Sequence, residues 1–119
     1  MSQLVEAIRR NTKHLFESAS IMLQTCNMDY VLCDFPIWKH VYHMLHSCDQ
    51  YFINPHEYTE PTFHELNLNS LNIMTEKVLT REDLNKYCDD VCNKIMQYID
   101  SLTDETLCEV PQGCRSNLL

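Results

Sequence analysis

The sequence predicts an all-α protein, an antiparallel bundle of helices that forms a single domain over residues 1–119. With one glycine and four prolines, the chain lacks the frequent turn signals that an all-β protein requires. Hydrophobic residues make up 45% of the composition, which is enough for one buried core. Three segments, at about residues 4–24, 35–53 and 81–102, repeat their apolar side chains with the period of a helix.

The first expected helix covers residues 4–24, and Ser2 is a suitable N-cap for it. Its apolar side chains recur at nearly helical spacing, although Asn11 and Thr12 interrupt them. This stripe consists of Leu4, Ile8, Leu15, Ala19 and Met22. Residues 26–33 are expected to be a plain connection to the next helix.

The second expected helix covers residues 35–53. Asp34 and Pro36 are typical of a helix start, and the pair Asn54-Pro55 is typical of a helix end. The apolar residues between these signals alternate at spacings of three and four, a pattern that favours packing against another helix at a shallow angle. They are Trp38, Val41, Leu45, Cys48 and Phe52.

The third expected helix covers residues 81–102 and has the clearest start, because Thr80 and Asp83 fit a capping box. Its seam follows a heptad pattern and consists of Leu84, Cys88, Val91, Ile95, Tyr98 and Leu102. Residues 54–79, which precede this helix, lack a sustained period and are expected to form a long connection with a short helical turn near residues 71–74.

The chain after the third helix carries another cap signal at Thr103, followed by helix-breaking residues at Pro111 and Gly113. A further helix is expected to begin at Ser116, close to the last residue, Leu119. Three long helices are therefore expected, with a fourth helix missing or truncated.

Charge and hydropathy restrict the partners and the compartment. The net charge of −8, from nine basic and seventeen acidic residues, argues against a nucleic-acid partner. No apolar run is long enough for a membrane span, and the N-terminus lacks the pattern of a secretory signal. A cytoplasmic protein without a membrane partner is therefore expected.

The seven cysteines have two readings. Several occupy apolar helix positions and their number is odd, which favours reduced thiols packed in a cytosolic core. A disulfide framework, as in secreted proteins, is the alternative. Cys88 and Cys92 lie one helical turn apart, a spacing that suits core packing and also zinc binding or redox chemistry.

Three of the six histidines, His40, His43 and His46, stand at three-residue spacing in the second expected helix. Imidazole is the commonest protein ligand for transition metals, and two residues one turn apart can reach the same ion. On a helical wheel, however, all three lie away from the apolar seam, which also fits an ordinary polar surface. His14, His56 and His64 are possible further ligands by residue type, but their spacing favours isolated surface or loop histidines.

The order of several short segments resembles the DinB-like and YfiT-like superfamily, whose members are metal-binding four-helix bundles. The matching segments are WKHVYH at residues 38–43, DQYF at 49–52, PTFHEL at 61–66, VLTREDL at 78–84 and LTDETL at 102–107. Together they extend over most of the chain. The resemblance implies a site in which one histidine of the second helix joins an H-x3-H pair on the last helix to hold zinc or nickel.

Within this resemblance His43 best matches the second-helix ligand, with His40 and His46 as alternates. The H-x3-H pair has no counterpart in this sequence, so the metal site is expected to be incomplete. The resemblance implies thiol-dependent transfer or metal-dependent hydrolysis on a small-molecule or thiol substrate. The alternative is a non-catalytic interaction module in which the exposed seam of a three-helix bundle forms a homo-oligomer, such as a dimer.

Overall fold

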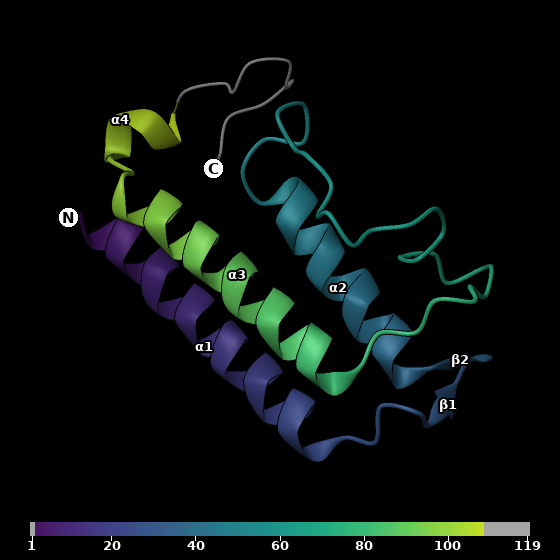
Figure 1. Ribbon diagram of the computed structural model, residues 1–119. Helices are drawn as coiled ribbons and strands as arrows, with labels where there is room; N and C mark the ends of the chain where they lie inside the picture. The colour runs from purple at the N-terminus through teal and green to yellow at the C-terminus, as the bar shows by residue number, and fades with distance from the viewer. Residues whose placement is uncertain (1, 109–119) are drawn as a thin grey trace.

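Three long helices dominate residues 2–108, the part of the chain that the computed structural model describes (Figure 1). They are α1 (Gln3–Thr25), α2 (Ile37–Tyr51) and α3 (Arg81–Asp100). Two short strands, β1 (Val31–Leu32) and β2 (Phe35–Pro36), lie between α1 and α2, and the four-residue helix α4 (Asp104–Leu107) follows α3. The prediction of an all-α fold is confirmed. The breaks expected at Pro111 and Gly113 and the helix expected from Ser116 lie outside the described residues.

The direction of the helices differs in part from a simple antiparallel bundle. Figure 1 shows that α1 runs opposite to both α2 and α3, whereas α2 and α3 run in the same direction. The long connection after α2 makes this arrangement possible, because it returns the chain to the end of the molecule where α2 began. The prediction of antiparallel neighbours therefore holds for α1 against the other two helices, but not for α2 against α3.

Helix α3 is the central helix and packs against both α1 and α2. The capping box predicted at its start is confirmed: the Thr80 hydroxyl accepts from Asp83 N at 3.1 Å, and the Asp83 carboxylate accepts from Thr80 N at 2.9 Å. Most of the predicted seam of α3 is buried, and Ile99 takes the place that was expected for Tyr98. The largest fully buried apolar side chains of the core are Trp38, Tyr42, Leu23, Leu45, Leu68, Leu84, Ile95, Ile99 and Leu107.

Helix α1 begins as predicted, since the Ser2 hydroxyl accepts a hydrogen bond of 3.1 Å from Val5 N. Its buried face agrees with the predicted stripe only in part, because Ile8, Ala19 and Met22 are half-buried against the core. Val5, Thr12 and Leu23 are buried, whereas Leu4 and Leu15 keep 45% and 71% of their surface exposed. The reason is that, within residues 2–108, α3 is the only long helix that α1 packs against extensively, so these residues leave one flank of the stripe uncovered.

The segment between α1 and α2 is a β-hairpin, although a plain connection was predicted. Val31 pairs with Pro36 and Leu32 with Phe35, and the two turn residues between the strands, Cys33 and Asp34, have φ angles of 51° and 73°. This left-handed backbone is the geometry of a tight hairpin turn. Because Phe35 and Pro36 belong to the second strand, α2 begins at residue 37 rather than 35.

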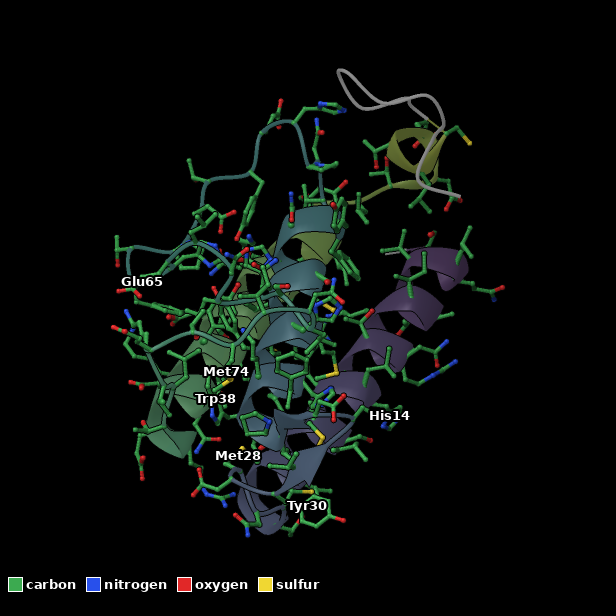
Figure 2. The ribbon with its side chains drawn as sticks, turned by 90° about the vertical axis from the view of Figure 1, so that its right-hand side faces the viewer. His14, Met28, Tyr30, Trp38, Glu65 and Met74 are labelled. Atoms are coloured by element: carbon green, nitrogen blue, oxygen red, sulfur yellow. The ribbon has the colours of Figure 1, made fainter. Side chains whose placement is uncertain are left out.

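The connection between α2 and α3 lies along the side of α2 that faces away from α1. Figure 2 shows this arrangement, with Glu65 and Met74 on the connection and His14 on α1 at opposite sides of the molecule. The ammonium group of Lys39 fixes the connection to α2, because it donates to the carbonyl oxygens of Asn67 at 2.8 Å and Leu68 at 3.0 Å. Residues 71–73 form bends, so the helical turn predicted there is absent.

None of the helices within residues 2–108 combines the length and the apolar composition needed to cross a lipid bilayer.

Candidate metal centre

Helix α2 has a second buried face, the one that the connection covers. No pattern in the sequence indicated it. Lys39, Tyr42, His46 and Asp49 lie on this face, at spacings of three, four and three residues, and all four are buried. For His46, the interpretation as part of an ordinary polar surface is therefore wrong, and Lys39 on the same face is buried as well. Their positions looked exposed because they carry polar side chains, but the connection covers them and supplies their hydrogen-bond partners.

The covered face of α2 brings His46 together with two residues of the connection, Glu60 and His64. His46 Nε2 lies 2.7 Å from Glu60 Oε2, and His64 Nε2 lies 3.6 Å from the same oxygen. One nitrogen or oxygen atom from each of the three residues lies within 4.8 Å of the other two. Within residues 2–108, this is the one group of three or more histidine, cysteine or acidic residues that meets that condition.

The distances of this cluster suit a transition metal. A tetrahedral zinc ion bound at 2.0–2.2 Å separates its ligand atoms by about 3.3–3.5 Å. The contact between His46 and Glu60 is shorter than this, and the contact between His64 and Glu60 is close to it. Two imidazoles and one carboxylate also form the donor set of many catalytic zinc sites. To surround one ion, the contact between His46 and Glu60 would have to lengthen, and separations of up to 4.8 Å within the group would have to close to about 3.5 Å.

Further hydrogen bonds orient the two imidazole rings. His64 Nδ1 and the Tyr42 hydroxyl are 2.7 Å apart, and the Asn69 side-chain amide lies 3.4 Å from His46 Nδ1. The two rings stack at a centroid distance of 4.8 Å and an angle of 24°. A histidine ligand normally has its second ring nitrogen held by a hydrogen bond, because this bond fixes the tautomer and the direction of the first nitrogen. His64 has such a partner, because the Tyr42 hydroxyl can accept from Nδ1–H. At His46 the Asn69 amide nitrogen donates to Nδ1, which leaves the ring proton on Nε2, toward the Glu60 carboxylate.

The cluster is closed on the side of α2 and open on the side of Glu60. The side chain of His46 is 3% exposed and that of His64 is 14% exposed, whereas Glu60 is 48% exposed. Burial lowers the pKa of His64 below its ordinary value, although the nearby Glu60 carboxylate opposes this shift. The His64 ring is therefore neutral at pH 7, which is the protonation state that a metal ligand requires.

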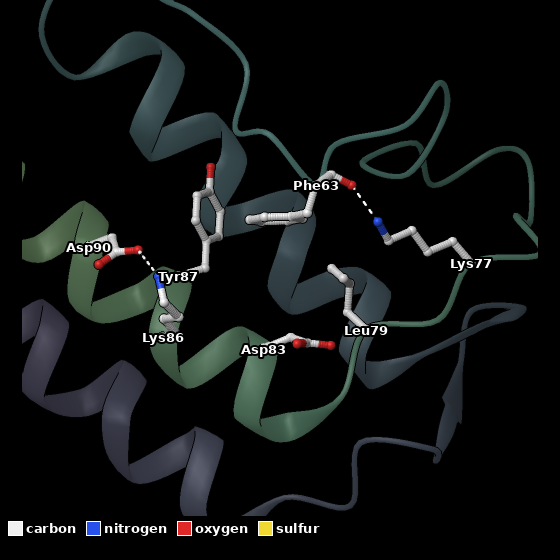
Figure 3. A pocket seen from close by; sticks show the side chains of 7 residues that line it. All are labelled: Phe63, Lys77, Leu79, Asp83, Lys86, Tyr87 and Asp90. Carbon is white, nitrogen blue, oxygen red and sulfur yellow. Dashed lines mark hydrogen bonds and ion pairs between the residues drawn. The ribbon is translucent and has the colours of Figure 1, made fainter.

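Beside the cluster, Asp49 links α2 to α3. Asp49 Oδ2 accepts a hydrogen bond of 2.8 Å from the hydroxyl of Tyr87, and Asp49 Oδ1 forms an ion pair with Lys94. A hollow of about 180 Å³ lies between α3 and the connection, next to this link. Figure 3 shows that the rings of Phe63 and Tyr87 lie side by side at this hollow, with a centroid distance of 5.3 Å. Phe63 directly precedes His64, so the hollow and the cluster share one segment of the connection.

The other two predicted ligands, His40 and His43, lie outside the cluster. His40 Nε2 contacts the carbonyl oxygen of Leu32 at 2.7 Å, which attaches α2 to the β-hairpin. His43 is exposed, and its Nδ1 contacts the carbonyl oxygen of Asn69 at 2.7 Å. The structure thus places one of the three predicted histidines, His46, in a group that could hold an ion.

The sequence analysis missed Glu60 and assigned His64 to an isolated loop position. One signal could have indicated them: the spacing Glu60-x3-His64 in a connection that directly follows a histidine-bearing helix.

The thiol pair Cys88 and Cys92 is less suited to zinc binding or redox chemistry than the cluster. Burial raises the pKa of Cys88 to about 11 and also raises that of Cys92, so both thiols stay protonated at neutral pH.

Comparison of the chain with protein-family models, with curated proteins and with solved structures gives no match. The resemblance to the DinB-like superfamily therefore stays a prediction, and the function must be argued from the site itself.

Proposed function

We propose that the protein binds a divalent transition-metal ion, preferably zinc, through His46, Glu60 and His64. The observation that supports this proposal is the convergence of three ligand atoms within 4.8 Å of one another, one from α2 and two from the connection. The donor set of two imidazoles and one carboxylate suits zinc, and it also accepts nickel. Tyr42 would act as the outer hydrogen-bond partner that orients His64. Asn69 would do the same for His46 once its amide oxygen, rather than its nitrogen, faces Nδ1.

This assignment differs from the site implied by the DinB-like resemblance. That resemblance assigned the helical ligand to His43 and the other two ligands to an H-x3-H pair on a last helix. In the proposed site, the ligand on α2 is His46, three residues further along, and the connection supplies the other two ligands. The proposed site therefore needs no helix beyond α4.

A site with three protein ligands leaves one coordination position for water or a substrate atom. An ion bound there would supply Lewis-acid activation of a water molecule or a thiol. Glu60, the most exposed of the three ligands, lies where such a molecule would enter. Hydrolysis and thiol transfer, the reactions that the resemblance implies, are accordingly the activities to test once binding is established.

The proposal is tested by measuring zinc affinity with isothermal titration calorimetry and zinc content by mass spectrometry after gel filtration. We expect one zinc per chain and a loss of affinity on the order of 100-fold or more in His64→Gln and in Glu60→Gln, since even outer-shell changes cost 10–100-fold. His43→Gln is the matched control: it removes a histidine of the same helix that lies outside the cluster. This variant should bind zinc like the original chain.

Cysteine thiols could bind zinc independently of the cluster, because Cys33 and Cys108 are exposed. Cobalt distinguishes the two cases, since thiolate ligands give an intense charge-transfer band that nitrogen and oxygen ligands do not. A cobalt spectrum without this band supports the proposed site. Zinc binding that is unchanged in His64→Gln and Glu60→Gln, or that is lost in His43→Gln, would overturn the proposal.

A further inference from the structure

An apolar groove runs between α1 and α2, on the side of the molecule away from the metal cluster. Its volume is about 270 Å³. Its walls are four residues of α1, three residues of α2 and Phe52, the residue that directly follows α2. The one hydroxyl among these residues, that of Thr12, donates to the carbonyl oxygen of Ile8 at 2.7 Å and so is already satisfied. At the rim, Leu15 is 71% exposed and Met44 is 40% exposed. The groove is therefore an apolar surface that faces solvent.

The flanks of α1 and α2 beside the groove carry no aspartate, glutamate, lysine or arginine. At 100° per residue, the flank of α1 next to Leu15 consists of Leu4, Asn11, Ser18 and Met22. The corresponding flank of α2 consists of Ile37, His40, Ser47 and Tyr51. None of these residues is aspartate, glutamate, lysine or arginine, although charged residues make up 22% of the chain. An uncharged apolar surface of this extent is typical of an interface.

The same surface contains both a groove and a ridge that could enter one. The ridge is the flank of α1, where Leu4, Ile8, Asn11, Leu15, Ser18 and Met22 follow spacings of 4, 3, 4, 3 and 4 residues. Four of the six side chains are apolar, and Ile8 and Met22 among them are half-buried against the core. The apolar part of the ridge that faces outward is therefore Leu4 and Leu15. A surface that offers a ridge and a groove side by side is complementary to itself under a two-fold rotation.

We propose that this surface is the interface of a homodimer, in which Leu15 of each copy enters the groove between α1 and α2 of the other copy. Two chains of net charge −8 repel each other, so a contact between copies requires a surface without charges, and the α1–α2 face provides one. With helices of 23 and 15 residues and about 10 Å of width each, the face offers roughly 600 Å² per copy, near the 800 Å² of a standard interface.

The dimer is tested by sedimentation velocity of the full 119-residue chain over a concentration series. We expect a species of twice the 14.1 kDa chain mass at high concentration. Leu15→Glu and Met44→Glu should give monomers with an unchanged circular dichroism spectrum. Leu66→Glu is the matched control, because Leu66 is 85% exposed but lies on the connection, far from the groove in sequence and on another element. This variant should still dimerise.

A charge-swap experiment tests the two-fold arrangement directly. A mixture of Leu15→Glu and Leu15→Lys chains should form a mixed dimer, since the two substituted positions lie near each other across the proposed axis. Three results would overturn the proposal: a monomer at all concentrations, a dimer that persists in Leu15→Glu, or a mixture that stays monomeric. A monomer that dimerises only after residues 109–119 are removed would show that this segment, rather than a second copy, covers the groove.

The homodimer and the metal site are independent, because they involve different faces of α2. Zinc binding lost in His64→Gln should leave the dimer intact, and Leu15→Glu should leave zinc affinity unchanged.

Discussion

Replacing Tyr87 with phenylalanine should lower the free energy of unfolding by about 1.5–2 kcal/mol, the lower part of the range for a hydrogen bond to a charged group. Tyr87 is 4% exposed and its hydroxyl donates to the Asp49 carboxylate at 2.8 Å. Phenylalanine keeps the ring contacts with Phe63 and Tyr42, so no cavity forms. The estimate stays in the lower part of the range because Lys94 still pairs with Asp49 after the substitution.

Urea unfolding followed by circular dichroism measures this loss, and the slope of the transition should stay constant. Tyr51→Phe is the matched control: Tyr51 is 63% exposed, so its free energy of unfolding should change by less than about 0.5 kcal/mol. In an Asp49→Asn background, Tyr87→Phe should cost much less, because the two substitutions remove the same interaction. If the losses of unfolding free energy in Tyr87→Phe and Asp49→Asn were fully additive, the hydrogen bond between the two residues would not be their cause.

The pH dependence of the same variant provides a second test. Burial, together with the hydrogen bond and the charge of Asp49, raises the pKa of the Tyr87 hydroxyl above its ordinary value of about 10. A group whose pKa is raised in the folded state stabilises it fully below the unfolded pKa, and this stabilisation is lost as the pH rises. The difference between the original chain and Tyr87→Phe should therefore be constant from pH 7 to about pH 9 and shrink above about pH 10.

Three further predictions concern other parts of the molecule. Replacing Cys33-Asp34 with Asn-Gly should raise the free energy of unfolding by about 1 kcal/mol in urea titrations, since left-handed backbone costs most side chains about 1–2 kcal/mol. Arg81→Ala should lower it by about 1–2 kcal/mol, because the guanidinium donates to two carbonyls at the end of α1; an unchanged melting temperature would contradict this. Because the pKa of Cys88 is raised to about 11, the free energy of unfolding should fall between about pH 9 and pH 11. Alkylation of the native protein at pH 8 should label Cys33 and Cys108 but not Cys88.

The fold class and the starts of α1 and α3 could be predicted from the sequence because they depend on neighbours in the chain. The cap at Ser2 and the capping box of Thr80 and Asp83 each involve residues only three positions apart. The seam of α3 was visible because this helix is covered by neighbours on both sides and its apolar residues therefore follow a regular period. The hairpin was missed because its turn residues, Cys33 and Asp34, are not the asparagine and glycine that usually indicate one.

From the sequence one could tell that the chain is helical, where α1 and α3 begin, and that the second helix carries a stripe of histidines. Only the tertiary structure decided which histidine meets other ligands. The physical reason is that the connection has no period of its own, yet it covers one face of α2 and satisfies the polar groups there, so His46 and Lys39 are buried at positions that look exposed in the sequence. Glu60 and His64 lie 14 and 18 positions beyond His46, and contacts over that distance depend on the path of the chain in space rather than on any local pattern.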